Sequence, residues 1–427
     1  MVRFERAIRV RLTALPVYYG WVVVAVCFAC SLGIFGAVYS FGVLFDPIVN
    51  EFGRSYGGTS VIFSVQSVVT FGSAALLGVG VDRYGVRQLM PVATVLSVSG
   101  LVLAGLAPSF LVVVVAYSVV AATGFGIVFV IAYSTTTQWF TERRGFATAL
   151  ATSGTGFGIV LVPPAISALV PHVGWRGGYF ALAAGLGTVF FVAIMLLDDS
   201  PHDVEGVSTA RADPAPRRRT TAFGEQLGTV LRAGRSPPFV LLFVGLLLAL
   251  APAYVMLVHG VEHATEAGVG RTVGVVAIST LGGMNVVGKF LVGPLADRVG
   301  TLRALSMCAV STGVGGLAMS QVDAVGPFLA VTAFMGVGYG GIGALLSPAV
   351  AEMFGTLDVN ALFGLVSLSL AITGSVVPYV AGVGFDAFGT FGPSFLVGGV
   401  TAWTAVALFF VADAASVPDR ADSGADI

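Results

Sequence analysis

The sequence predicts an all-α integral membrane protein whose transmembrane helices form two similar six-helix halves. Of its 427 residues, 56% are hydrophobic and only 10% are charged, a balance that water-soluble domains do not reach. The chain contains twelve apolar runs long enough to cross a bilayer, and one polar motif returns 215 positions after its first occurrence. These three observations together indicate a duplicated helical membrane protein.

Each long apolar run is interpreted as one helix, because a spanning helix needs about 20 apolar residues. In lipid, only helices and closed barrels satisfy all backbone polar groups. The first run is too long for the core of a signal peptide and no small-residue cleavage site follows it, so we expect it to be retained. The predicted spans are residues 18–44, 58–80, 89–107, 110–137, 145–170, 174–197, 238–259, 270–295, 302–320, 325–353, 360–385 and 391–413.

The distribution of arginines predicts the orientation. With a cytoplasmic N-terminus, 17 of the 20 arginines fall on the cytoplasmic side, which predicts that both termini are cytoplasmic. The stretch between the sixth and seventh spans is rich in Pro, Arg and small polar residues, which is typical of a linker. The predicted parts are an N-terminal bundle (1–198), a cytoplasmic linker (199–237) and a C-terminal bundle with a short tail (238–427).

An internal repeat supports this division. The segments GVGVDRYGVRQ, from Gly78, and GPLADRVGTLR, from Gly293, each lie at the cytoplasmic end of the second span of their half. The same offset of 215 aligns three further pairs, which are Pro163 with Pro378, Gly174 with Gly389, and Phe180 with Phe395. Duplication of one six-helix unit explains these matches.

The twelve spans, the basic central loop and the G-x-x-x-D-R-x-G-x-[RK] loop in both halves resemble the major facilitator superfamily. Other segments resemble its monocarboxylate porters and their relatives, which include oxalate–formate antiporters. These segments are YYGWVVV at 18–24, YSFGVLFDPIVNEFG at 39–53, QWFTERRGFATALATSGTGFG at 138–158, VHGVEHATEAGVG at 258–270 and NVVGK at 285–289. The resemblance implies a major facilitator fold of two pseudo-symmetric bundles and a transporter rather than an enzyme.

The loop motif places charge pairs at helix ends. Asp82 with Arg83, and Asp297 with Arg298, lie where they can cap helices and hold neighbouring helices together. The resemblance implies a conformational latch on the cytoplasmic face, and the alternative is charge that only sets the orientation. Arg144, at the start of the fifth span, is expected to join this network unless it lies in a solvated turn.

Lys289 is the only lysine in the chain, and it lies inside an apolar run. Asp297, near the cytoplasmic boundary, is eight residues further on, a distance of about 12 Å along a helix. A charge at this depth costs about 2.5 to 3.5 kcal/mol, so it should face a wet cavity. In the resembling group, a cation here binds the substrate carboxylate, usually as arginine, with Asp or Asn four residues earlier. Asn285 occupies that place, one turn away; the alternative role for Lys289 is a structural buried charge.

Other candidates for the site are weaker. Tyr39 stands where many animal relatives carry a lysine, and Tyr117 and Tyr339 could donate hydroxyls to a carboxylate; the alternative for each is aromatic packing between helices. Lys289 is also expected to couple protons, since lysine, unlike arginine, can lose its proton. His259 is the second candidate for proton coupling, unless it is an interfacial histidine. The eleventh span holds no cation, which counts against a two-cation dicarboxylate site.

Several apparent signatures are better explained by packing. Gly336, Gly338 and Gly341 spell G-x-G-x-x-G, but they lie inside the tenth span without a preceding strand, so we expect close helix packing. Gly154 and Gly158 are interpreted in the same way. The chain has only three cysteines, Cys27, Cys30 and Cys308, which predict no metal site. There is no Walker loop, and we expect no cofactor.

From the resemblance we expect a secondary active transporter that moves a small monocarboxylate across the cytoplasmic membrane by proton symport and alternating access. Its expected partners are a small organic anion, a proton and the lipid bilayer, with no nucleic acid and no obligate protein partner. One alternative is an organic-anion exchanger of the oxalate–formate type. Another is a non-transporting receptor built on the same scaffold.

Overall fold

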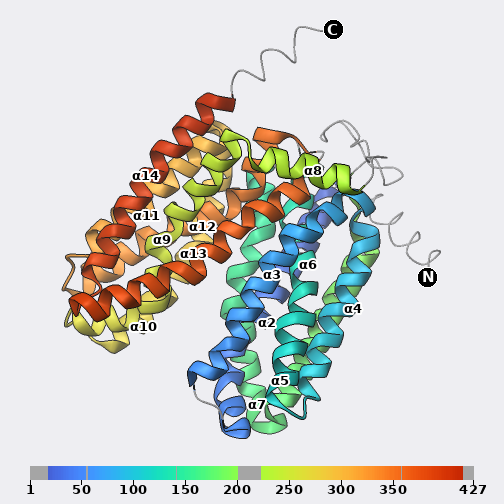
Figure 1. The fold of residues 1–427 in the computed structure, drawn as a ribbon, viewed down its shortest axis with the longest axis horizontal. Coiled ribbons are helices and arrows are strands. Elements are labelled where there is room, and N and C mark those ends of the chain that lie inside the picture. Colours follow the sequence, from blue (N-terminus) through green and yellow to red (C-terminus); the bar gives the residue numbers. More distant parts are fainter. Residues whose placement is uncertain (1–17, 54–55, 141, 201–222, 357, 417–427) are drawn as a thin grey trace. The chain divides into compact units, whose positions relative to one another are not determined.

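The structure is a computed structural model that describes residues 18–53, 56–140, 142–200, 223–356 and 358–416. Every regular element within these ranges is a helix (Figure 1). Among the described residues, eleven helices are long and apolar enough to cross a membrane. The predicted all-α membrane fold is therefore confirmed.

The helices of the first half follow the predicted spans closely. They are α2 (Gly20–Phe52), α3 (Tyr56–Tyr84), α4 (Val86–Gly105), α5 (Phe110–Val113), the π-helix η1 (Val114–Ala121), α6 (Ala122–Trp139) and α7 (Arg144–Leu196). Helices α5, η1 and α6 run on from one another and make one crossing. Helix α2 packs against α7, α4 packs against α7, and α3 packs against α6.

Helix α7 accounts for two of the twelve predicted crossings. It covers 53 residues, far more than one bilayer crossing requires. The backbone leaves the helical conformation at Gly174, where φ is 70° and ψ is 174°. This break falls between the predicted spans 145–170 and 174–197, so the eleven long helices provide twelve crossings.

Within its described residues, the second half has six long helices and one short one. They are α8 (Phe223–Gly234), α9 (Pro237–Glu266), α10 (Arg271–Val299), α11 (Thr301–Met319), α12 (Val325–Phe354), α13 (Val359–Phe388) and α14 (Gly392–Ser416). Helix α9 packs against α14, α10 and α11, and α11 also packs against α14. We did not predict α8, which lies in the predicted linker. Its apolar residues Phe223, Leu227, Val230 and Leu231 recur at helical spacing without proline.

Pairs of glycines with positive φ support the internal repeat. A positive φ is a conformation that glycine adopts without steric cost. Three such pairs are separated by the repeat offset of 215 residues: Gly53 and Gly268 (59° and 76°), Gly85 and Gly300 (83° and 93°), and Gly174 and Gly389 (both 70°). The two halves therefore end and restart their helices at equivalent positions.

The described chain forms two compact units. The first comprises Met1–Val230 with Phe354–Leu365, and the second comprises Leu231–Met353 with Val366–Ile427. The start of α13 thus belongs to the first unit. The predicted boundaries at 198 and 238 stay predictions, because residues 201–222 of the predicted linker lie outside the described residues.

The expected packing role of the glycine motifs is confirmed. A Cβ atom on Gly158 would lie 2.9 Å from the backbone nitrogen of Gly36 in α2. A Cβ on Gly336 would lie 2.8 Å from the carbonyl oxygen of Leu281 in α10. Since real Cβ atoms do not approach so closely, only glycine allows these backbones to touch.

Candidate functional site

Lys289 and Asn285 lie on the buried face of α10. Their exposed fractions are 3% and 8%, whereas Val287 and Leu291 on the same helix are exposed by 40% and 59%. Lys289 is ten residues before the end of α10 at Val299, a distance of about 15 Å along the axis. The structure therefore places the only lysine of the chain deep in a membrane helix and turns it toward the interior of its unit.

Two glycines bring α12 into backbone contact with α10 on either side of this pair. A Cβ on Gly288 would lie 2.8 Å from the Cα of Val337, and one on Gly340 would lie 2.6 Å from the carbonyl carbon of Asn285. These contacts leave no room for a side chain at either glycine. They fix the segment of α12 that follows Gly340 beside Lys289.

Gly343 is the position of α12 that faces the lysine side chain. A Cβ built there would have one neighbour within 4 Å, the Cε of Lys289 at 3.9 Å. Gly343 is half-buried, while the residues around it, 340–342 and 344–351, are buried. Space beside the lysine side chain therefore remains open on the α12 side, and the absence of a side chain at Gly343 keeps it open.

Tyr339 shares a face of α12 with Gly343, because the two residues are four positions apart. Its ring lies edge-on to the ring of Tyr254 in α9, with centroids 6.2 Å apart. Tyr254 is in turn close to α13, since a Cβ on Gly374 would lie 2.9 Å from its ring. The sequence did not single out Tyr254, because a tyrosine in an apolar span carries no charge that marks it.

The two tyrosines predicted in the first half have different surroundings. Tyr117 is fully buried in η1, where its ring stacks on Phe41 with centroids 5.9 Å apart. Its hydroxyl donates to the carbonyl of Ala37 at 3.5 Å, so the side chain takes part in helix packing. Tyr39 is 39% exposed and stacks on Phe35. A role of either tyrosine in binding stays a prediction.

His259 lies near the end of α9 in the second unit. Its Nε2 is 3.0 Å from the carbonyl oxygen of Pro378 in α13, and its ring stacks on Phe391 with centroids 4.7 Å apart. The ring is half-buried. His259 thus contacts α13 through Pro378 and the start of α14 through Phe391. A role of His259 in proton coupling stays a prediction.

Asp82 caps the first turn of α13. One carboxylate oxygen accepts hydrogen bonds from the side-chain amide of Asn360 at 2.6 Å and from its backbone N–H at 3.2 Å. The other accepts the backbone N–H of Ala361 at 2.8 Å. Asn360 also accepts a hydrogen bond from the hydroxyl of Ser134 in α6. Because the N-terminus of a helix carries partial positive charge, the carboxylate stabilises this junction.

The other residues of the predicted latch lie at helix ends. Arg83 extends over the ring of Tyr84, 5.7 Å from its centroid. Asp297 and Arg298 are exposed at the end of α10, and the guanidinium of Arg144 donates to the carbonyl of Phe140 at 3.1 Å. A latch role for these residues stays a prediction.

Two pseudo-symmetric sets of six crossings, with a buried charge on one helix, are the architecture of a secondary transporter. The family model of the Major Facilitator Superfamily matches residues 26–290 and 263–425. The chain belongs to this superfamily, and it is a membrane transporter rather than an enzyme.

Relatives agree with this assignment, and a solved structure shares the fold. The chain is 29% identical to human (Homo sapiens) monocarboxylate transporter 11 over 393 residues, covering 89% of this chain and 80% of the relative. It is 25% identical to mouse (Mus musculus) monocarboxylate transporter 4 over 394 residues, covering 90% and 81%. A solved structure of the proton:xylose symporter XylE matches with a TM-score of 0.69 at 14% identity, covering 92% of this chain and 95% of the other.

Proposed function

We propose that this transporter carries small monocarboxylate anions across the cytoplasmic membrane together with a proton, by alternating access. The observation that carries the proposal is the burial of Lys289 beside the open space at Gly343. An ammonium group there supplies the positive charge that a carboxylate needs, and the space supplies room for the rest of a small anion. The names of the relatives support the same substrate class.

The chemistry of lysine explains the coupling to protons. Burial disfavours the charged ammonium, whereas a bound carboxylate favours it, so binding of the anion promotes binding of the proton. Asn285, one turn away, can donate a hydrogen bond to the same carboxylate. The loaded site is then neutral in sum, and transport is electroneutral. An arginine would stay charged throughout the cycle and could not carry the proton.

Uptake into proteoliposomes tests the proposal. Vesicles containing the purified protein are given radiolabelled lactate, formate or oxalate, with and without an inward proton gradient. We expect the gradient to accelerate uptake of lactate and formate. Uptake that depends on a preloaded anion and ignores the gradient would instead indicate an exchanger, and absence of uptake would indicate a receptor.

The size of the anion is predicted to depend on Gly343. Gly343→Leu should reduce transport of lactate relative to formate by about tenfold or more, since pocket selectivity for added carbon atoms has this magnitude. The ratio of initial uptake rates for the two anions measures the effect. Gly326→Leu on the same helix is the control, because a Cβ on Gly326 meets nothing within 4 Å. An unchanged ratio in Gly343→Leu would place the substrate away from α12.

The cytoplasmic location of both termini is a further part of the proposal. It rests on the 17 arginines that fall on one side. A cysteine introduced at Ser208 should be protected from impermeant thiol reagents added to intact cells, whereas a cysteine at Ser55 should react. Both positions lie outside the described residues. The opposite labelling pattern would invert the proposed orientation.

A further inference from the structure

The ends of α9 and α2 carry equivalent carboxylates. Glu51 and Glu266 are separated by the repeat offset of 215 residues, and each is close to the end of the first helix of its half. Each carboxylate also bonds to the beginning of the sixth crossing of its own half. In each half, a glutamate at the same repeat position therefore joins the end of the first helix to the beginning of the sixth crossing.

In the first half the carboxylate faces a permanent cation. Glu51 Oε2 accepts hydrogen bonds from Arg176 Nη1 and from Trp175 Nε1, both at 2.6 Å. Arg176 also donates to the carbonyl of Ala107 at 3.0 Å. The hydrogen bond from Arg176, with that from Trp175, lowers the pKa of Glu51. Glu51 therefore stays ionised and paired with Arg176 throughout the physiological pH range.

In the second half a histidine takes the place of the arginine. Phe391 stands at the repeat position of Arg176, and its backbone N–H donates to Glu266 Oε2 at 3.0 Å. The group that faces this carboxylate is His263, whose Nδ1 is 3.8 Å from the same oxygen. In the first half the repeat position of His263 is occupied by Ile48, which is fully buried.

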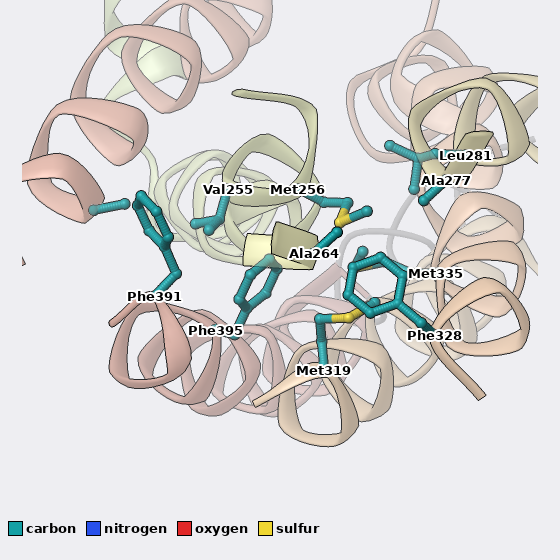
Figure 2. Packing of buried hydrophobic residues seen from close by; sticks show 11 residues of the cluster. Val255, Met256, Ala264, Ala277, Leu281, Met319, Phe328, Met335, Phe391 and Phe395 are labelled. Atoms are coloured by element: carbon teal, nitrogen blue, oxygen red, sulfur yellow. The ribbon is translucent and has the colours of Figure 1, made fainter. Parts of the chain in front are cut away.

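The surroundings of His263 determine which nitrogen carries a hydrogen. The residue is 4% exposed, and its ring packs against Phe395 and Phe328, with centroid distances of 4.6 and 5.9 Å. Both aromatic residues belong to the buried cluster in Figure 2, with Met319. His263 Nε2 is 3.0 Å from the carbonyl oxygen of Met319. A carbonyl only accepts, so Nε2 carries the hydrogen in the neutral ring.

Neutral His263 then turns a lone pair toward a carboxylate. Its Nδ1 is buried and has no hydrogen-bond partner among the described residues. Such a group is costly, because the acceptor has lost water and gained no donor. A proton on Nδ1 removes the unfavourable contact and provides a charge-assisted donor to Glu266.

Glu266 faces His263 at 3.8 Å. His259, a second titratable residue one turn earlier on α9, is directed to the carbonyl of Pro378 and the ring of Phe391. The other described charges on the helices packed around His263 lie far along those helices or in an exposed turn. Arg303, Glu352 and Asp413 lie at the ends of α11, α12 and α14 that are remote from His263. Lys289, Asp297 and Arg298 lie in the second half of α10, and Asp323 lies in the exposed turn after α11. The side chains of Glu262, Arg271 and Asp386 lie outside the described residues.

We propose that His263 and Glu266 form a proton-operated clasp at the junction of α9 with the end of α11 and the start of α14. The hydrogen bonds to Met319 and Phe391 hold this junction with a neutral ring, and a proton on Nδ1 tightens it by adding a charge-assisted contact to Glu266. The clasp is tight while the ring carries both protons and loosens when Nδ1 loses its proton. It is separate from Lys289 and needs no substrate. In the proposed orientation this end of the bundle faces the outside of the cell, so the clasp would respond to external pH.

Hydrogen–deuterium exchange of the purified full-length protein in lipid nanodiscs tests the clasp. Protection of the amides around residues 389–396, corrected for intrinsic exchange rates, should be about tenfold greater near pH 5.5 than near pH 8. His263→Gln keeps a donor for Met319 but cannot titrate, and Glu266→Gln keeps an acceptor for Phe391 but cannot form the ion pair. Each variant should lose the pH difference.

Glu51→Gln is the matched control, since it alters the Glu51–Arg176 contact of the first half. This variant should retain the difference in amide protection at 389–396 between the two pH values. Equal protection at both pH values in the unmodified protein, or a full difference in both His263→Gln and Glu266→Gln, would overturn the proposal. His263→Gln should also keep acceleration of uptake by a proton gradient. Failure of the monocarboxylate proposal would leave the exchange result unchanged, so the two proposals are tested separately.

Discussion

Lys289→Gln is expected to abolish carboxylate binding, whereas Lys289→Arg should bind the anion and lose its coupling to protons. Glutamine removes the charge that a buried anion requires, and loss of one partner of such a pair weakens binding by about thirtyfold or more, about 2 kcal/mol. Arginine keeps the charge but cannot release a proton. Isothermal titration with lactate measures binding, and proteoliposome uptake with and without an inward pH gradient measures coupling.

Arg303→Gln is the matched control for this pair of variants. It also removes one positive charge from the second half, but Arg303 is an exposed side chain whose Nε pairs with Asp413 at 3.4 Å. Binding and coupling should both survive that change. If Lys289→Arg were accelerated by the pH gradient as strongly as the unmodified protein, the proton would travel elsewhere, and His259 would be the next residue to test.

The sequence predicted the features that hydropathy and charge reveal directly. A lysine within an apolar run is conspicuous because burial of its charge is costly, so Lys289 was found without the structure. Asn285 was found through its spacing of one helical turn. The packing glycines were also recognised, because a dinucleotide-binding motif cannot function inside a membrane span. Each of these inferences uses residues that lie close together in the sequence.

Contacts between distant segments were not predictable in the same way. Asn360 lies 278 residues from Asp82, and nothing in its local sequence indicates that the two side chains meet. His263 and Glu266 lie past the predicted end of the seventh span at residue 259, where polar residues ordinarily mark the water boundary. Helix α9 continues to Glu266, because helices extend beyond the apolar stretch that hydropathy detects.

Asp82→Asn is expected to slow transport by about five- to tenfold while equilibrium binding of the anion changes little. The variant keeps the shape of the side chain but removes the charge from the first turn of α13, where such interactions contribute about 1 to 1.5 kcal/mol. If the carboxylate stabilises one state of the transport cycle, its loss shifts the balance of states without touching Lys289. Initial uptake rates and lactate titrations on the same preparation separate the two effects.

A cap elsewhere in the first half distinguishes a latch from simple helix stabilisation. Asp199 accepts the first backbone N–H of α4, that of Val86, at 2.7 Å, so Asp199→Asn weakens a comparable cap at another helix. Asn360→Ala removes the amide that Asp82 holds and should slow transport in the same way as Asp82→Asn. The two changes combined should have little more effect than either alone, since both break one junction. If Asp82→Asn lost anion binding in proportion to its loss of transport, or if Asp199→Asn slowed transport equally, Asp82 would support the fold and would not control the transport cycle.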